Sequence, residues 1–123
     1  MMAYFFSAKQ AWQRPFFRWG AILALACVFA GSGYFLWKVW PAHRQSGTIV
    51  THYNIYLGID QVSPWSWAWL LPGVWLAVTL ADVALAYAMY RTDAYLAASL
   101  IVLACVWSLP WMGTLYHLTL INV

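Results

Sequence analysis

The fold is decided by residues 65–116, which read WSWAWLLPGVWLAVTLADVALAYAMYRTDAYLAASLIVLACVWSLPWMGTLY. This segment holds two long apolar stretches that are separated only by Arg91-Thr92-Asp93, and Asp82 is the one charged residue inside them. Each stretch has the roughly 20 residues that a helix needs to cross a hydrocarbon core of about 30 Å. Since so short a break permits only a tight turn, we expect two antiparallel transmembrane helices that are direct neighbours.

The composition of the whole chain supports a membrane protein. Of its 123 residues, 65% are hydrophobic and 7% are charged, and 10 are Trp. Six basic and three acidic side chains cannot solvate the outside of a globule of this size, whereas a lipid-facing surface needs almost none. The composition excludes a disordered tail, a disulfide scaffold and most soluble enzymes.

A further apolar stretch without a charge, from Trp19 to Trp37, precedes the hairpin. The expected fold is therefore an all-α integral membrane protein, with three transmembrane helices and a short extended segment in the outer loop. The expected layout is a cytoplasmic basic and aromatic arm at 1–18, transmembrane helices at 19–40, 67–90 and 95–115, an extracytoplasmic loop at 41–66, a cytoplasmic turn at 91–94 and an extracytoplasmic tail at 116–123.

Three parts of this layout have alternatives. The first span could instead be a cleavable signal peptide, because Val28-Phe29-Ala30 before Gly31 resembles a cleavage site, although the apolar run continues to Trp37. The N-terminal arm is either an interfacial helix that ends near Pro15 or a frayed tail. Beyond Pro110 the chain either continues as a kinked helix or leaves as an extended tail.

The basic residues predict the orientation, because Lys and Arg are retained on the cytoplasmic side. Four of them fall on one side and two on the other: Lys9, Arg14, Arg18 and Arg91 against Lys38 and Arg44. We expect a multi-pass protein of the bacterial cytoplasmic (inner) membrane, with its N-terminus cytoplasmic and its C-terminus extracytoplasmic. The net charge of +3 follows from this asymmetry and from the anionic lipids of the inner leaflet, so no nucleic-acid partner is expected.

Small residues recur at helical spacing in all three spans. Small side chains let helices approach closely in lipid, so we expect packing seams, although chance recurrence of Ala is the alternative. The expected helix-packing residues are Gly20, Ala24, Cys27 and Gly31 in the first span, Ala77, Ala81, Ala84 and Ala88 in the second, and Ala94, Ala98 and Cys105 in the third, beside Ala97, Ala104 and Ser108.

Asp82 is the anomalous residue of the second span. A carboxylate near the membrane interior costs on the order of 2.5 to 3.5 kcal/mol, so we expect Asp82 to face protein or a water cavity and to bond with Thr79 one turn away. By helical angle it points about 130° away from the alanine stripe, so this helix has two faces that require protein contact. Asp82 and Thr79 are thus the candidate intramembrane functional residues.

The outer loop contains a stretch rich in β-branched and aromatic residues, which favours an extended segment. The candidate partner-contact residues in this loop are His52, Tyr53, Asn54, Tyr56 and Asp60. Histidines on this side follow no spacing typical of zinc ligands, so no metal site is expected. The sequence also has no phosphate loop, nucleophile elbow or paired carboxylates, so it predicts no catalytic residue and no cofactor.

The segment HYNIYLGID at 52–60, followed by Pro64-Trp65 and two hydrophobic spans, resembles a segment of small bacterial three-span membrane proteins that have no assigned activity. The resemblance covers about half of the chain. It implies one span, an external HYNIYxGID-type segment and then a hairpin of two spans, and it brings no catalytic residue and no substrate.

Two functions fit these patterns. The first is a non-enzymatic interaction or assembly subunit of a membrane complex, whose partners are the lipid bilayer and either another protein or further copies of the chain. The second is an oligomeric proton- or cation-coupled transporter or channel component that uses Asp82. An enzyme is the least supported class.

Overall fold

The computed structural model describes residues 1–54, 56 and 58–122, and the side chains of residues 42–46, 52–54 and 59–61 lie outside this description. The chain is mostly helical and carries one small antiparallel sheet. Its elements are α1 (Met2–Gln13), α2 (Pro15–Ser46), β1 (Thr48–Asn54), β2 (Gly58–Pro64), α3 (Trp67–Met89) and α4 (Ala94–Asn122).

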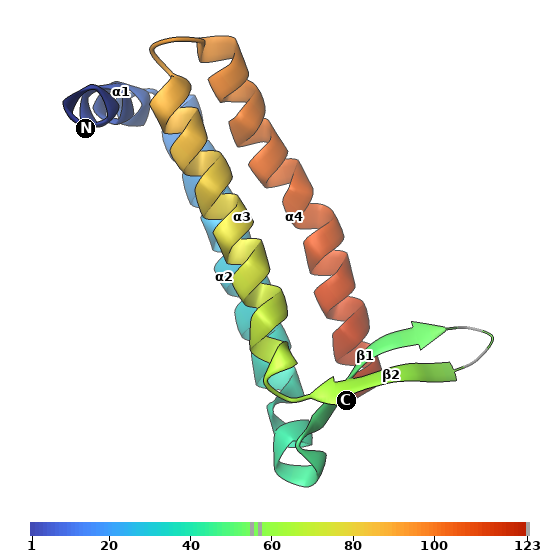
Figure 1. The fold of residues 1–123 in the computed structure, drawn as a ribbon. Coiled ribbons are helices and arrows are strands. Elements are labelled where there is room, and N and C mark those ends of the chain that lie inside the picture. Colours follow the sequence, from blue (N-terminus) through green and yellow to red (C-terminus); the bar gives the residue numbers. More distant parts are fainter. Residues whose placement is uncertain (55, 57, 123) are drawn as a thin grey trace.

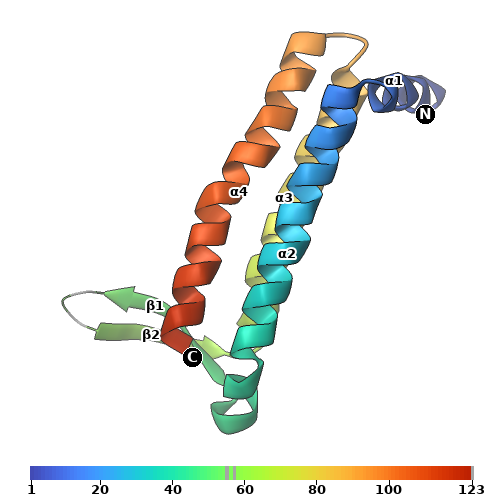
Figure 2. The same ribbon diagram turned by 180° about the vertical axis from the view of Figure 1, so that it is seen from behind.

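Three helices are long and apolar enough to cross a membrane, and their spans are Pro15–Pro41, Trp67–Met89 and Ala94–Asn122. They lie alongside one another in both views, with α1 across one end of the bundle and the β-hairpin at the other (Figures 1 and 2). The predicted three-helix architecture is therefore confirmed. The turn between α3 and α4 lies at the same end as α1.

The N-terminal arm is a helix and not a frayed tail. It ends at Gln13 because Arg14 takes an extended conformation, with φ −86° and ψ 123°, which a residue before a proline prefers. The Ser7 hydroxyl is buried and donates to the backbone carbonyl of Tyr87 at 2.7 Å. This bond fastens α1 to the end of α3.

Both the first and the third span extend beyond their expected bounds. The helix of the first span, α2, continues through Pro41 to Ser46, since a proline removes one backbone hydrogen bond without necessarily ending a helix. Of the two alternatives beyond Pro110, the continuing helix is confirmed for the described residues, because α4 runs through Pro110 to Asn122. Leu115 and Leu118 are buried in the core cluster beside the hairpin, and this packing holds the last turns helical.

The core has a different composition at each end. Near α1 it consists largely of small residues with a few larger ones, namely Ala11, Phe17, Ala21, Ala86, Tyr87, Ala97 and Ile101. Near the hairpin it consists largely of bulky residues, namely Val28, Phe35, Val39, Ile49, Trp65, Ala68, Trp75, Leu115 and Leu118. Trp75 stacks on Trp111 of α4, with ring centroids 6.1 Å apart, and so fills the space between the two helices.

The small residues of α2 pack against its neighbours. Gly20 lies so close to Ile101 of α4 that a Cβ atom there would collide with the isoleucine side chain, and a Cβ at Gly31 would lie 2.9 Å from the ring of Trp75. Ala24 is buried, and Cys27 is half-buried. The thiol of Cys105, also half-buried, donates to the carbonyl of Gly20 at 3.4 Å.

The expected seam on the second span is wrong for contacts within the chain. Three of its residues, Ala77, Ala81 and Ala84, are exposed, and Ala88 is half-buried. The opposite side of α3 is buried instead, because the indole of Trp75 is fully enclosed there and contributes far more apolar area than an alanine. The buried residues of α3 are Ala68, Pro72, Trp75, Thr79, Ala86 and Tyr87.

The seam of the third span needs a smaller correction. Ala94 is exposed, whereas Ala98 and Cys105 are half-buried. The fully buried small residues of α4 are Ala97, Ala104 and Ser108, which lie on a neighbouring line of the helix. Both lines of small residues have helical spacing, so the spacing alone does not show which line is buried. Contact with α2 decides it.

Replacing Gly20 by Val should separate α2 from α4. The new side chain would overlap with Ile101, whose β-branched side chain has little rotamer freedom in a helix, and overpacking of this kind costs about 1–3 kcal/mol. Gly33→Val is the matched control, because a Cβ at Gly33 has no neighbour within 4 Å. Unfolding of both variants in detergent would be followed by circular dichroism, and equal stability of the two would contradict the close contact.

Candidate functional site

The β-hairpin begins where α2 is stopped by a glycine. Gly47 has φ +67°, a left-handed conformation that glycine adopts without strain at the end of a helix. β1 and β2 then pair antiparallel, from Thr48 opposite Pro64 to Asn54 opposite Gly58. The register shifts between Val50 and His52, as in a β-bulge, which bends and twists a strand pair.

The base of the hairpin is buried in the bundle. Ile49 and Trp65 belong to the same hydrophobic cluster as Phe35 of α2 and Leu115 of α4. The backbone amide of Trp65 donates to the carbonyl of Gly47 at 3.0 Å and closes the base. A two-stranded hairpin is marginal by itself in water, so this anchorage supplies the stability that the pairing alone lacks.

Asn122 attaches the last turn of α4 to the edge of β1. Its Nδ2 donates to the carbonyl of Val50 at 2.8 Å, and its Oδ1 accepts from the amide of Val50 at 2.6 Å. The side-chain amide thus acts as one residue of an additional strand. Nδ2 also donates to the carbonyl of Leu118 at 2.8 Å, so the asparagine is fixed from its own helix as well.

Sequence reasoning did not select Asn122. The available signal was an amide side chain in an otherwise apolar stretch near the expected outer membrane surface. Such a group requires hydrogen-bond partners when it is enclosed. The sequence offered no means of identifying Val50 as that partner, since the two residues are 72 positions apart.

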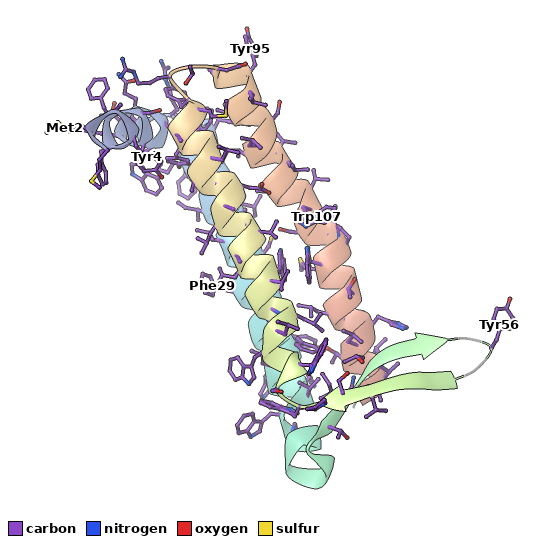
Figure 3. The ribbon with its side chains drawn as sticks, viewed as in Figure 1. Met2, Tyr4, Phe29, Tyr56, Tyr95 and Trp107 are labelled. Atoms are coloured by element: carbon purple, nitrogen blue, oxygen red, sulfur yellow. The ribbon has the colours of Figure 1, made fainter. Side chains whose placement is uncertain are left out.

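The tip of the hairpin projects away from the three helices (Figure 1). Tyr56 is at this tip and is 92% exposed, and its side chain points away from the bundle (Figure 3). The other expected partner-contact residues, His52, Tyr53, Asn54 and Asp60, have side chains outside the described part of the chain. Their backbones lie in β1, for His52, Tyr53 and Asn54, and in β2, for Asp60.

Asp82 lies at the margin of the buried face of α3. The three residues expected on its side of the helix, Trp75, Thr79 and Ala86, are all buried, whereas Asp82 is half-buried. Among the described residues, no hydrogen bond or ion pair is formed by the Asp82 carboxyl, so the expected bond to Thr79 is absent. The chain thus brings these two residues to one face without joining them.

Comparison with protein-family models, with curated proteins and with solved structures gave no match for this chain.

Replacing Asn122 by Ala should loosen the hairpin while the bundle stays folded. The change leaves the amide and the carbonyl of Val50 without their partner, which costs about 1–2 kcal/mol. The Val50 amide should then exchange hydrogen about tenfold faster. Thr114→Ala is the control, since Thr114 is exposed on the same helix and bonds only to its own backbone at Pro110. Unchanged exchange at Val50 would show that Asn122 does not hold the strand.

Proposed function

We propose that the chain is a small non-enzymatic integral membrane protein that serves as an interaction or assembly subunit of a membrane complex. One observation carries this proposal, namely the anchored hairpin whose tip projects from the bundle with Tyr56 exposed. A bundle that only filled lipid would gain nothing from fastening such an element to two of its helices. An exposed element that is anchored at its base is, however, suited to binding, because less ordering entropy remains to be lost.

The edges of the hairpin support a particular kind of contact. The sheet contains only β1 and β2 in the described part of the chain, so the outer edge of β2 keeps backbone donors and acceptors free for another strand. The opposite edge, on β1, is occupied at Val50 by Asn122. Exposed strand edges accept extended segments of partner proteins, so we expect the partner to bind along β2.

The proposal places the chain in the bacterial cytoplasmic membrane with α1 on the cytoplasmic side. The support is the charge distribution, because Lys9, Arg14, Arg18 and Arg91 all belong to the end formed by α1 and the α3–α4 turn. At the opposite end Lys38 lies over the ring of Trp37 at 4.7 Å, which is typical of a cation held among interfacial aromatic residues. The hairpin then faces the extracytoplasmic side.

Tyr56→Ser should weaken the complex about tenfold or more, because exposed tyrosines that become buried are frequent hot spots of interfaces. Tyr95→Ser is the matched control, since Tyr95 is 90% exposed at the opposite end of the bundle (Figure 3). The measurement is the amount of a defined partner that co-purifies at fixed stoichiometry from the native membrane. Equal recovery with the two variants would contradict a binding role for the hairpin tip.

The half-buried carboxyl of Asp82, which has no partner among the described residues, favours a second candidate: a homo-oligomer that couples proton or cation movement to this residue. On that hypothesis Asp82→Asn abolishes flux in proteoliposomes, and the chain forms a closed ring of copies. The subunit proposal expects no flux before or after the change. Asp93→Asn is the control, because Asp93 caps α4 through the amide of Leu96 and Asn is an equally good cap.

A further inference from the structure

A polar groove is formed by residues at the end of α1 and the end of α3. These helix ends lie at the opposite end of the molecule from the hairpin (Figure 1). Its volume is about 360 Å³, and it is lined mainly by polar surface from Gln10, Gln13, Arg14 and Tyr90. This composition is unusual for a chain that is 65% hydrophobic. Neither the hairpin nor Asp82 contributes to the groove, so the proposed subunit role does not account for it.

The residues of the groove present hydrogen-bond donors. Nε of Arg14 donates to the hydroxyl oxygen of Tyr90 at 3.0 Å, which leaves the N–H groups on both Nη atoms and the phenolic proton of Tyr90 available. Gln10 and Gln13 add two side-chain amides and form no hydrogen bond through them among the described residues. No carboxylate lines the groove, so the site is rich in donors and carries a positive charge.

The donors are held in place by packing below the groove. The ring of Tyr90 contacts the ring of Phe17 edge-to-face, with centroids 5.0 Å apart. Arg14 is fixed at the extended junction before Pro15, and Ala11, one turn before it, is fully buried. Packing therefore holds the phenol, and the exposed guanidinium is joined to it by the bond from Nε, so a ligand would lose less free energy in ordering the pair.

The surroundings indicate what kind of ligand fits. Large aromatic side chains on this end of the molecule, Trp12, Phe16 and Trp19, are exposed, as is typical of residues at the level of lipid headgroups. Among the described residues the basic side chains of Lys9, Arg18 and Arg91 form no ion pair with a carboxylate. An anion bound here would meet unneutralised positive charge and an apolar surface continuous with the spans.

The geometry points to a binding site for the phosphate group of an anionic phospholipid, with Arg14 and Tyr90 as its principal donors and the two glutamines as additional ones. Arginine suits this role because its planar guanidinium forms charge-assisted hydrogen bonds to phosphate oxygens. The acyl chains of the lipid would lie along the apolar surface of the bundle. This inference rests on the proposed membrane location of the chain but not on a protein partner.

The test uses the full chain in nanodiscs of phosphatidylcholine, with phosphatidylglycerol added as the probe. Phosphatidylglycerol that stays bound to the chain is counted by native mass spectrometry after release from the nanodisc. Arg14→Gln should lower the apparent affinity about tenfold, because it removes the charge-assisted hydrogen bonds that the guanidinium would donate to the phosphate oxygens. Tyr90→Phe, which changes neither charge nor shape, should lower it by a smaller factor and tests the site if Arg14→Gln unfolds.

Lys9→Gln is the matched control, because it removes one positive charge from α1, the helix that ends just before Arg14, and Lys9 does not line the groove. If Lys9→Gln and Arg14→Gln reduced binding equally, the lipid would be held by general surface charge and the site would be overturned. Equal retention of phosphatidylcholine and phosphatidylglycerol would overturn it as well. Binding of inorganic phosphate in place of the lipid, with the same dependence on Arg14, would overturn the lipid assignment. If Tyr56→Ser abolished binding of the protein partner but not of the lipid, the two sites would be independent, as this inference expects.

Discussion

The close approach of α2 to α4 is the contact on which the rest of the molecule depends. These two helices are not consecutive long helices along the chain, yet Gly20 meets Ile101 directly and accepts a hydrogen bond from Cys105 through its carbonyl. In lipid there is no hydrophobic gain from bringing helices together, so close van der Waals contact and such hydrogen bonds have to hold them. The missing side chain at Gly20 permits this distance.

This contact also determines where the far end of α4 lies. A helix is stiff, so fixing Ile101 against α2 fixes Asn122, which is about 30 Å further along the axis at 1.5 Å per residue. There Asn122 meets Val50, and the hairpin gains its second attachment. A small residue near one end of the bundle therefore controls the position of an exposed element at the other end.

The sequence was a good guide to the number and order of the long helices. Hydropathy decides which segments cross a membrane. Of the two options for the arm, the helix that ends near Pro15 is the one observed, since α1 ends at Gln13. The strands were anticipated only as an extended segment, because their pairing depends on a base that α2 and α4 enclose.

The sequence was a poor guide to which faces of the helices are buried. On α3 the alanine spacing was as regular as the spacing of glycine and alanine on α2, but Ala77, Ala81 and Ala84 are exposed, whereas Gly20 and Gly31 meet side chains of neighbouring helices. Small residues permit close packing and do not require it, whereas the bulky Trp75 has a large apolar area to bury and turns its own side inward. The attachment of Asn122 was missed for another reason, since local patterns carry no information about a partner 72 positions away.

The exposure of the alanine side of α3 bears on the candidate site at Asp82. With the alanine side exposed, α3 presents to lipid a surface on which another helix could approach closely, and Asp82 lies between that surface and the core without a partner among the described residues. A carboxyl in this position costs on the order of 2.5 to 3.5 kcal/mol in lipid, which is a large part of the stability of a small protein.

A partner helix that supplied a hydrogen-bond donor at the depth of Asp82 would offset that cost. Together with a strand added along β2, it would hold the complex at two well-separated points, and two linked contacts bind more tightly than either does alone.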